Sequence, residues 1–246
     1  NQPVWYFRGY KAIGIFQDTA EINHYGAVNP TTGNFQLYQK QAKPGDVKFA
    51  DVAGTDENGK VVMKPDGKID DADKVNIGDP NPDFIFGLNF SCEFKGFDFG
   101  MFWNGVAGNQ IFFAAFRGDR GAYNKPEIYF TERWTGPGTS NKYPRATYND
   151  KNGNLAASTL NISDGDYIRL KSLSLGYTLP NNITSKIGIS KLRIYGVATN
   201  LLTFTSYKGT DPEIGQMDMT TNNSYGIDRG LYPSPQTFTV GVNVNF

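Results

Sequence analysis

The last eleven residues of the chain decide the fold: Gln236-Thr237-Phe238-Thr239-Val240-Gly241-Val242-Asn243-Val244-Asn245-Phe246. Apolar side chains occupy every second position, and the positions between them hold glycine or a polar residue. The apolar set is Phe238, Val240, Val242, Val244 and Phe246. Strict alternation over this length predicts a β-strand with one apolar and one polar face. The length also matches the roughly 9 to 11 residues of a tilted strand that crosses a membrane.

The same alternation occurs twice more between residues 84 and 105, on either side of the dipeptide Lys95-Gly96. Residues 84–94 carry apolar side chains at even positions, and residues 97–105 carry them at odd positions. Two alternating segments joined by two residues, one of them glycine, predict a tight antiparallel hairpin.

Two further strands, at 166–179 and 191–204, alternate less regularly. In the first, Arg169 and Lys171 share the parity of the apolar residues Leu173 and Leu175. Either this strand rises beyond the apolar band at that point, or a β-bulge resets its register. In the second, two sets of apolar residues compete for one face, so the sequence leaves its faces unassigned.

The connections between these five strands are alternately short and long. Short ones lie at 95–96 and near 180–190, whereas long loops are expected near 17–83, 106–165 and 206–235. Compact globular domains rarely contain such long loops, while outer-membrane barrels combine short periplasmic turns with long extracellular loops. The sequence therefore predicts an all-β fold, with antiparallel strands of a transmembrane β-barrel.

Composition excludes several other classes of protein. The 246 residues include 24 Lys and Arg against 24 Asp and Glu, without the cationic excess typical of a nucleic-acid-binding protein. No apolar run approaches the roughly 20 residues of a membrane helix. His24 is the only histidine, which excludes histidine pairs and relays, and Glu127 and Glu132 are the best carboxylate pair for glycoside hydrolysis. Because nothing arranges that pair for catalysis, we do not expect an enzyme.

The alternative to a barrel is a soluble or surface-anchored β-sandwich that binds glycans, since its strands also alternate apolar and polar residues. The outer face of a sandwich normally carries Lys, Glu and Arg. Here the polar positions are mostly Gly, Ser, Thr and Asn, which favours the barrel.

Several segments, taken together and in this order, resemble the C-terminal part of SusC/RagA-type TonB-dependent outer-membrane transporters of Bacteroidetes. The segments are Trp5–Phe16, Ala42–Phe49, Asp66–Asp73, Ile77–Phe84, Gly165–Lys171, Leu192–Tyr195, Asn200–Leu201, Asp211–Glu213 and the terminal strand. They extend over nearly the whole chain.

This resemblance implies a large barrel of the plugged 22-stranded class in the bacterial outer membrane. Such a transporter imports oligosaccharides or peptides, works with a SusD-like surface lipoprotein and draws its energy through TonB. Nothing in this chain matches a plug domain or a TonB box. We therefore expect residues 1–246 to be a C-terminal segment that pairs with the N-terminal remainder of the same barrel in the lipid bilayer.

An acidic segment, Asp66-Gly67-Lys68-Ile69-Asp70-Asp71-Ala72-Asp73, resembles the second half of an EF-hand calcium loop. The first half does not match, because Val62 and Lys64 occupy its ligand positions. Asp51, which precedes this segment by 15 residues, could supply a further carboxylate ligand. The segment is thus either a Ca²⁺ site built from Asp66, Asp70, Asp73 and Asp51 or a solvated acidic turn, and no other cofactor is expected.

Aromatic residues and arginines are interleaved in the long loop predicted near 106–165. Aromatic faces stack on sugar rings, and arginines bind hydroxyl groups or carboxylates, so four of these residues are candidates for contact with substrate or lid: Tyr129, Arg133, Trp134 and Tyr143. The alternative is that they pack the loop against itself.

Overall fold

The structure is a computed structural model that describes residues 3–29, 32–114, 126–214 and 225–246. The chain divides into two compact units. The first, here called the loop unit, comprises Asn1–Pro80, Ile111–Ser163 and Gln216–Gly230. The second, the sheet unit, comprises Asn81–Gln110, Asp164–Gly215 and Leu231–Phe246.

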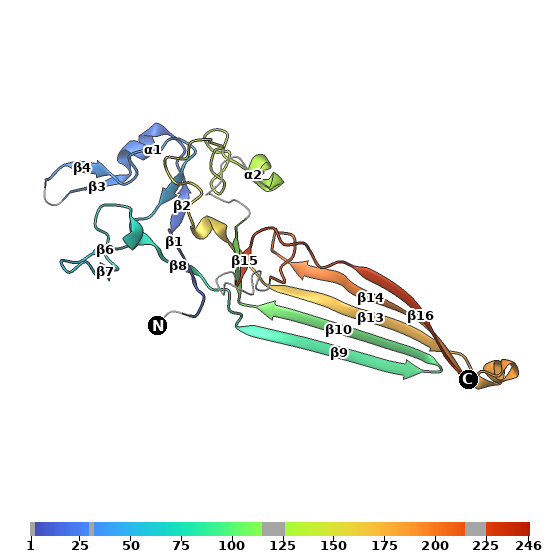
Figure 1. The fold of residues 1–246 in the computed structure, drawn as a ribbon. Coiled ribbons are helices and arrows are strands. Elements are labelled where there is room, and N and C mark those ends of the chain that lie inside the picture. Colours follow the sequence, from blue (N-terminus) through green and yellow to red (C-terminus); the bar gives the residue numbers. More distant parts are fainter. Residues whose placement is uncertain (1–2, 30–31, 115–125, 215–224) are drawn as a thin grey trace. The chain divides into compact units, whose positions relative to one another are not determined.

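The sheet unit is an antiparallel sheet of five long strands in the order β16-β14-β13-β10-β9 (Figure 1). Their bounds are Phe84–Phe94 for β9, Phe97–Ala107 for β10, Tyr167–Thr178 for β13, Lys191–Thr205 for β14 and Thr237–Asn245 for β16. Each lies within two residues of the range expected from the alternation. Neighbours in the sheet are also neighbours among these five strands along the chain, as in an up-and-down barrel wall.

The hairpin between β9 and β10 is the predicted two-residue turn. Lys95 and Gly96 have φ angles of 47° and 87°, both in the left-handed region that a type I′ turn requires. A Cβ on Gly96 would come within 2.7 Å of the Thr178 carbonyl oxygen. Backbone conformation and close packing therefore both require glycine at this position.

The irregularity of β13 is a bulge at Lys171. Leu170 pairs with Trp103 and Ser172 pairs with Phe102, so Lys171 has no partner on β10. The extra residue inverts the phase of the alternation, which confirms the second of the two explanations offered by the sequence.

A second irregularity settles the faces of β14. Leu170 pairs with Leu202 and Ser172 with Thr199, which leaves Asn200 and Leu201 unpaired beside the β13 bulge. Before this point Ile194, Gly196 and Ala198 lie on the apolar face, and after it Leu202 and Phe204 do. The two extra residues leave the parity of the strand unchanged. The sequence could not assign its faces because the polar face also carries Tyr195 and Val197, while Gly196 and Ala198 on the apolar face are small.

The apolar residues form continuous rows across the sheet. One row is Phe90, Met101, Leu173, Ala198 and Phe238, and the next is Cys92, Phe99, Leu175, Gly196 and Val240. The side chains in these two rows are exposed or half-buried and none is buried, with Phe238 at 72% and Val240 at 82% on the edge strand. A β-sandwich would bury this face beneath a second sheet, so the exposure contradicts the sandwich alternative.

The loop unit is built from the long connections, which are not structureless as the loop ranges implied. Its strands are short and pair as β1–β8, β2–β5, β3–β4, β6–β7 and β12–β11–β15. Their bounds are Phe7–Gly9 (β1), Ala12–Ile15 (β2), Gly26–Val28 (β3), Phe35–Leu37 (β4), Val47–Phe49 (β5), Gly54–Thr55 (β6), Val61–Val62 (β7), Val75–Gly78 (β8), Gln110–Phe113 (β11), Ile162–Asp164 (β12) and Ile227–Asp228 (β15).

The helices are also short. They are α1 (Thr19–His24), α2 (Glu127–Thr131) and α3 (Asn181–Thr184), with 3₁₀ turns at Asp71–Asp73, Thr159–Asn161 and Ser185–Ile187. None of the helices in the described ranges has the length and hydrophobicity needed to cross a membrane.

The core of the loop unit lies where β2 and β5 pair. Ile15, Val47 and Phe49 are buried there, and Trp134 and Leu160 pack against them from a distant part of the chain. A buried polar network reinforces this contact: Asp46 accepts hydrogen bonds from Arg145 Nε at 2.7 Å and from Asn154 Nδ2 at 2.9 Å. Residues about 100 positions apart are thus held together by both apolar and charged contacts.

Candidate functional site

The polar face of the five-stranded sheet is mostly small and uncharged in its middle. Two adjacent rows cross all five strands there. They are Asn89, Phe102, Ser172, Thr199 and Thr237, followed by Ser91, Gly100, Ser174, Val197 and Thr239. Such a surface offers hydroxyl and amide groups without a net charge.

Charged side chains lie at both ends of this face. At the end with the short turns, Arg193 of β14 donates through Nε to Asp98 of β10 at 2.8 Å and through Nη2 to the other oxygen. The pair spans β13 above Gly176, where a Cβ would come within 2.5 Å of Asp98 Oδ1. Glycine at this position therefore allows the two strands to be linked across the one between them.

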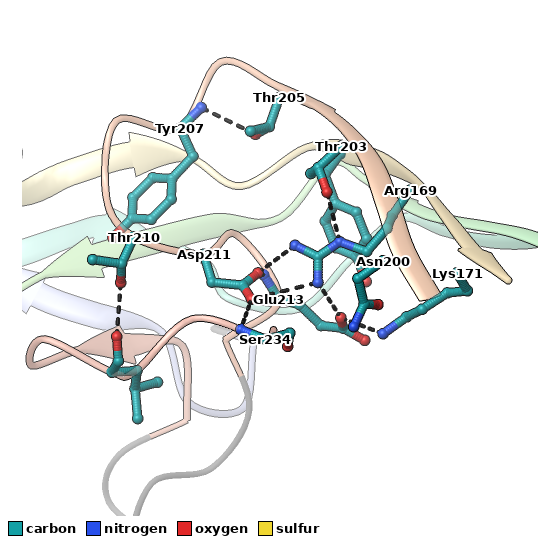
Figure 2. Close-up of polar contacts among 12 residues, drawn as sticks. Arg169, Lys171, Asn200, Thr203, Thr205, Tyr207, Thr210, Asp211, Glu213 and Ser234 are labelled. Carbon is teal, nitrogen blue, oxygen red and sulfur yellow. Dashed lines mark hydrogen bonds and ion pairs between the residues drawn. The ribbon is translucent and has the colours of Figure 1, made fainter. Parts of the chain in front are cut away.

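At the opposite end Arg169 is the centre of a second charged group (Figure 2). Its Nη2 lies 2.5 Å from Asp211 Oδ1, its Nη1 lies 2.8 Å from Glu213 Oε2, and its Nε donates to Thr203 Oγ1 at 2.8 Å. Lys171 Nζ reaches the same Glu213 oxygen at 2.6 Å. Two cations of β13 thus face two carboxylates of the long connection between β14 and β16.

The centre of this ion-pair group is buried, because the side chains of Arg169 and Asp211 are only 4% and 7% exposed, whereas Lys171 and Glu213 are partly exposed. Burial by itself would raise the pKa of Asp211. The hydrogen bonds that Asp211 accepts from Arg169 and from the backbone N–H groups of Ser234 and Glu213 outweigh burial and hold its pKa below the ordinary value. The carboxylate is therefore charged and fully hydrogen-bonded at neutral pH.

The four loop residues predicted to contact substrate or lid have different surroundings. Tyr129 and Tyr143 are buried against each other with Phe113 and Leu155, and the Tyr129 hydroxyl donates to the Arg145 carbonyl at 3.3 Å. Their rings support the local fold of the loop unit, as the packing alternative proposes. A direct contact with substrate or lid stays a prediction.

The other two candidates in this loop are partly exposed. Arg133 stacks over the ring of Phe130 with 5.7 Å to its centroid and donates to the Phe130 carbonyl at 2.6 Å. Trp134 packs on the β2–β5 core and donates through Nε1 to Gln17 Oε1 at 3.1 Å. Of the four, these two retain polar or aromatic surface for a ligand.

The four carboxylates of the predicted calcium site are occupied by backbone donors. Asp73 is fully buried and accepts from the N–H groups of Val52, Ala53 and Asp70 at 2.8 to 3.0 Å. Asp70 caps the 3₁₀ turn through the Ala72 N–H at 2.8 Å. These contacts make the segment a capped turn.

The remaining two carboxylates of that site follow the same pattern. Asp51 accepts from the N–H groups of Asp66 and Gly67, and Asp66 accepts from the Lys68 N–H. Burial raises the pKa of Asp51, despite those two hydrogen bonds. Within the described ranges no three or more acidic, histidine or cysteine residues gather as a metal-ligand group. The residues therefore do not fit a calcium ion as they stand.

The sequence alone does not identify Asp211 and Glu213 as partners of Arg169 and Lys171. The segment Asp211–Glu213 is notable there only for the family resemblance, and the two cations only for a break in parity. Two cations out of phase on a strand and two carboxylates in the next long connection were the available signal. Their pairing depends on the bulge, which alternation indicates but does not locate in space.

Curated proteins similar to this chain share one description. A TonB-dependent receptor P3 of Formosa agariphila is 32% identical over 253 residues, and TonB-dependent receptor P26 of the same organism is 30% identical over 251. Both alignments include all of this chain. The TonB-dependent receptor SusC of Bacteroides thetaiotaomicron is 24% identical over 223 residues, or 86% of this chain. The chain spans about a fifth of the length of these relatives, 22%, 23% and 19% respectively. No protein-family model matches it.

Solved structures agree with this fold. The RagAB peptide importer in its open-open state aligns with a TM-score of 0.61 and 18% identity, covering 98% of this chain and 22% of the solved one. Its closed-closed state gives a TM-score of 0.60. The chain is therefore a homologue of TonB-dependent receptors of the SusC/RagA type, and its fold is that of antiparallel strands from the barrel of such a transporter.

Proposed function

We propose that this chain forms part of the wall and the long loops of a bacterial outer-membrane barrel that imports a nutrient in a TonB-dependent manner. The observation that carries the proposal is the two-sided character of the five-stranded sheet. One face is a continuous apolar surface without buried side chains in its two central rows, and the middle of the other face consists mostly of small, uncharged residues. In a barrel, lipid would cover the apolar face and the polar interior of the barrel would meet the other face, so each surface would lie in an environment of its own polarity.

The strand lengths support a membrane position. The five strands contain 9 to 15 residues, which meets or exceeds the roughly 9 to 11 that a tilted membrane strand needs. The apolar face also carries aromatic rings near both strand ends, such as Phe94 and Phe97 beside the hairpin and Phe204 at the other end. Aromatic residues at these heights suit the two lipid–water interfaces.

The edges of the sheet support a larger barrel. Among the described residues, β9 and β16 each have a strand partner on one side only. Unpaired backbone groups in hydrocarbon cost several kcal/mol each. We propose that strands from the remainder of the same barrel pair with both edges.

Substrate and partners follow from the relatives. The proposed substrate is an oligosaccharide or a peptide, the proposed lid is a SusD-like surface lipoprotein, and energy arrives through TonB at a region outside this chain. A homologue named SusC and a neighbour described as a peptide importer support this. Phe130 with Arg133, and Trp134, are the loop residues whose exposure suits such contacts.

Cysteine labelling in native membranes tests the two faces directly. In a Cys92→Ser background, Thr239→Cys should react with a small, water-soluble, membrane-impermeant maleimide, because the attacking thiolate forms where water reaches the thiol. Val240→Cys, the adjacent residue on the opposite face, is the matched control and should resist this reagent until the protein is denatured. Equal labelling of both positions by the impermeant reagent would contradict the membrane assignment.

Uptake experiments test the transport step separately. A strain that lacks the protein should lose growth on particular oligosaccharides or on peptides as sole nutrient, and a strain without TonB should lose the same growth. Co-purification of a surface lipoprotein from detergent-solubilised membranes tests the lid. Growth that persists without TonB would contradict the proposed energy source.

A further inference from the structure

Asp211 accepts hydrogen bonds from three separate parts of the sheet unit. Its Oδ1 accepts from Arg169 Nη2 at 2.5 Å and from the Glu213 N–H at 3.0 Å, and its Oδ2 accepts from the Ser234 N–H at 2.9 Å (Figure 2). Arg169 belongs to β13, Glu213 to the start of the connection between β14 and β16, and Ser234 to its end. One buried carboxylate therefore joins both ends of this connection to the sheet.

Three further hydrogen bonds join the two ends of this connection to each other or to β14. Thr210 Oγ1 donates to the Leu231 carbonyl at 2.8 Å, again joining the start of the connection to its end. The β14 bulge holds the last residues: Asn200 Nδ2 donates to the Pro235 carbonyl at 3.0 Å, and Gln236 Nε2 donates to the Leu201 carbonyl at 3.0 Å. Asn200 has φ 52°, a conformation that asparagine tolerates better than most residues.

The two bulges explain why these contacts form here. The β13 bulge places Arg169 and Lys171 on the polar face although both follow the parity of the apolar residues beyond it. The β14 bulge opposite it leaves Asn200 and Leu201 free of strand pairing, so their polar groups can bind the returning chain. The neighbouring bulges of β13 and β14 thus provide the polar groups that bind the two ends of the β14–β16 connection.

We infer that Asp211 is a clamp that closes the stem of the β14–β16 connection, and that Arg169 is its positioning residue. The clamp holds segments 207–213 and 231–236 on the polar face of the sheet. Resting on the proposed function, the consequence is that the clamp sets how segments 207–213 and 231–236 lie along the substrate path. Without it the sheet remains, but the stem separates.

The pair Asp98–Arg193 is the matched control. It is also a two-contact arginine–carboxylate pair on the polar face, but it joins two strands and no connection. Loss of that pair should leave the loop stem unchanged. A general effect of removing a charge from this face would instead appear in both variants.

Hydrogen–deuterium exchange on the intact protein in detergent tests the clamp. In Asp211→Asn the peptides covering 207–214 and 231–236 should both exchange at least tenfold faster, while peptides from β10 and β13 keep their rates. Arg169→Lys retains the charge but not the fork of donors, and should give a smaller increase in the same two peptides. Asp98→Asn should leave both peptides unchanged.

Three results would overturn the clamp. They are unchanged exchange in Asp211→Asn, an increase in only one of the two peptides, or an equal increase in Asp98→Asn. If Asp211→Asn failed to fold, Arg169→Lys would carry the same test, because it leaves the carboxylate and its backbone donors in place.

Uptake separates the clamp from the function on which its consequence rests. At equal surface abundance, Asp211→Asn should lower the initial rate of TonB-dependent uptake several-fold relative to Asp98→Asn. Loosened stem peptides with no uptake by the wild-type protein would refute the proposed function and leave the clamp intact. Normal uptake by Asp211→Asn with a loosened stem would refute the role of the clamp in transport.

Discussion

Leu170 and Ser172, two positions apart on β13, pair with adjacent residues of β10, Trp103 and Phe102. The residue between them, Lys171, is therefore an insertion that inverts which face every following side chain occupies. On one side of it Arg169 lies on the polar face, and on the other Leu173 and Leu175 lie on the apolar face. A single residue thus decides whether a buried arginine lies on the polar or the apolar face of the sheet.

Deletion of Lys171 should prevent assembly of the folded protein, because the strand would realign and turn Arg169 toward the apolar face. Arg169 lies near the end of β13, where an arginine facing lipid costs only about 1 kcal/mol, so the larger loss would be its buried pairing with Asp211. Lys171→Ala keeps the bulge and should assemble nearly as well as wild type. The amount of heat-modifiable, folded protein in outer-membrane fractions measures both, and normal assembly of the deletion would show that the bulge is dispensable.

Acid should weaken the contact between Arg169 and Asp211 only at low pH. The folded-state pKa of Asp211 lies below its ordinary value of 3.8, so its contribution to stability is complete above that value. The contribution is lost as pH falls through the lower, folded-state pKa. The free energies of unfolding of wild type and Asp211→Asn, followed by tryptophan fluorescence, should differ by the same amount at pH 7 and at pH 5. This difference should shrink below about pH 3.8. A difference that shrinks between pH 7 and 5 would contradict the lowered pKa.

Asp46 should be essential to the loop unit. Its carboxylate is 1% exposed and accepts from Arg145, Asn154 and the Lys43 N–H. Asp46→Asn replaces one acceptor oxygen with a donor, so we expect a loss of about 2 to 3 kcal/mol, the order found when hydrogen bonds to a buried charge are removed. The protease resistance of residues 39–49 and 145–154 measures this loss of stability. Asp71→Asn, at an exposed carboxylate, is the control and should leave that resistance unchanged.

Arginine should be tolerated on only one face of the terminal strand. Val240→Arg places a charge on the apolar face and should reduce folded protein in the outer membrane, again by a cost of about 2 to 4 kcal/mol. Thr239→Arg, one residue away on the polar face, should assemble far better. Equal assembly of the two variants would mean that the apolar face does not contact lipid.

Calcium should have no effect on the acidic turn. Asp73 stabilises that turn by accepting three backbone hydrogen bonds, so Asp73→Asn should cost about 3 kcal/mol and increase proteolysis near Val52 and Ala53. Adding EGTA or millimolar CaCl₂ to the wild-type protein should not change that proteolysis. Protection by calcium that disappears in Asp73→Asn would instead restore the calcium site predicted from sequence.

Most of the sheet could be predicted because membrane strands are defined by local alternation. The ranges of β9, β10 and β16 and the Lys95–Gly96 turn follow from side-chain period and from glycine at a position that requires positive φ. The short strands of the loop unit could not be predicted in this way. They contain two to four residues, too few for a period to be visible, and they are held by distant contacts such as Asp46 with Arg145.

The candidate site shows the same division. Tyr129 and Tyr143 have the composition of a binding surface, yet their rings are buried, because sequence does not distinguish an aromatic residue that binds from one that packs. Asp66, Asp70 and Asp73 have the spacing of half a calcium loop, yet their oxygens and those of Asp51 accept backbone N–H groups. Residue type was informative in both cases, and only the surroundings of each side chain indicated its role.

The sequence by itself determined the strand ranges, the two-faced character of the sheet and the alternation of short and long connections, since each depends on neighbouring residues and the fixed period of a β-strand. Tertiary structure alone decided the phase of β14, the position of the β13 bulge and the joining of Arg169, Asp211 and Ser234. Those features depend on which residue of one strand lies opposite which residue of another. Cross-strand register is a relation between distant segments, and no local pattern contains it.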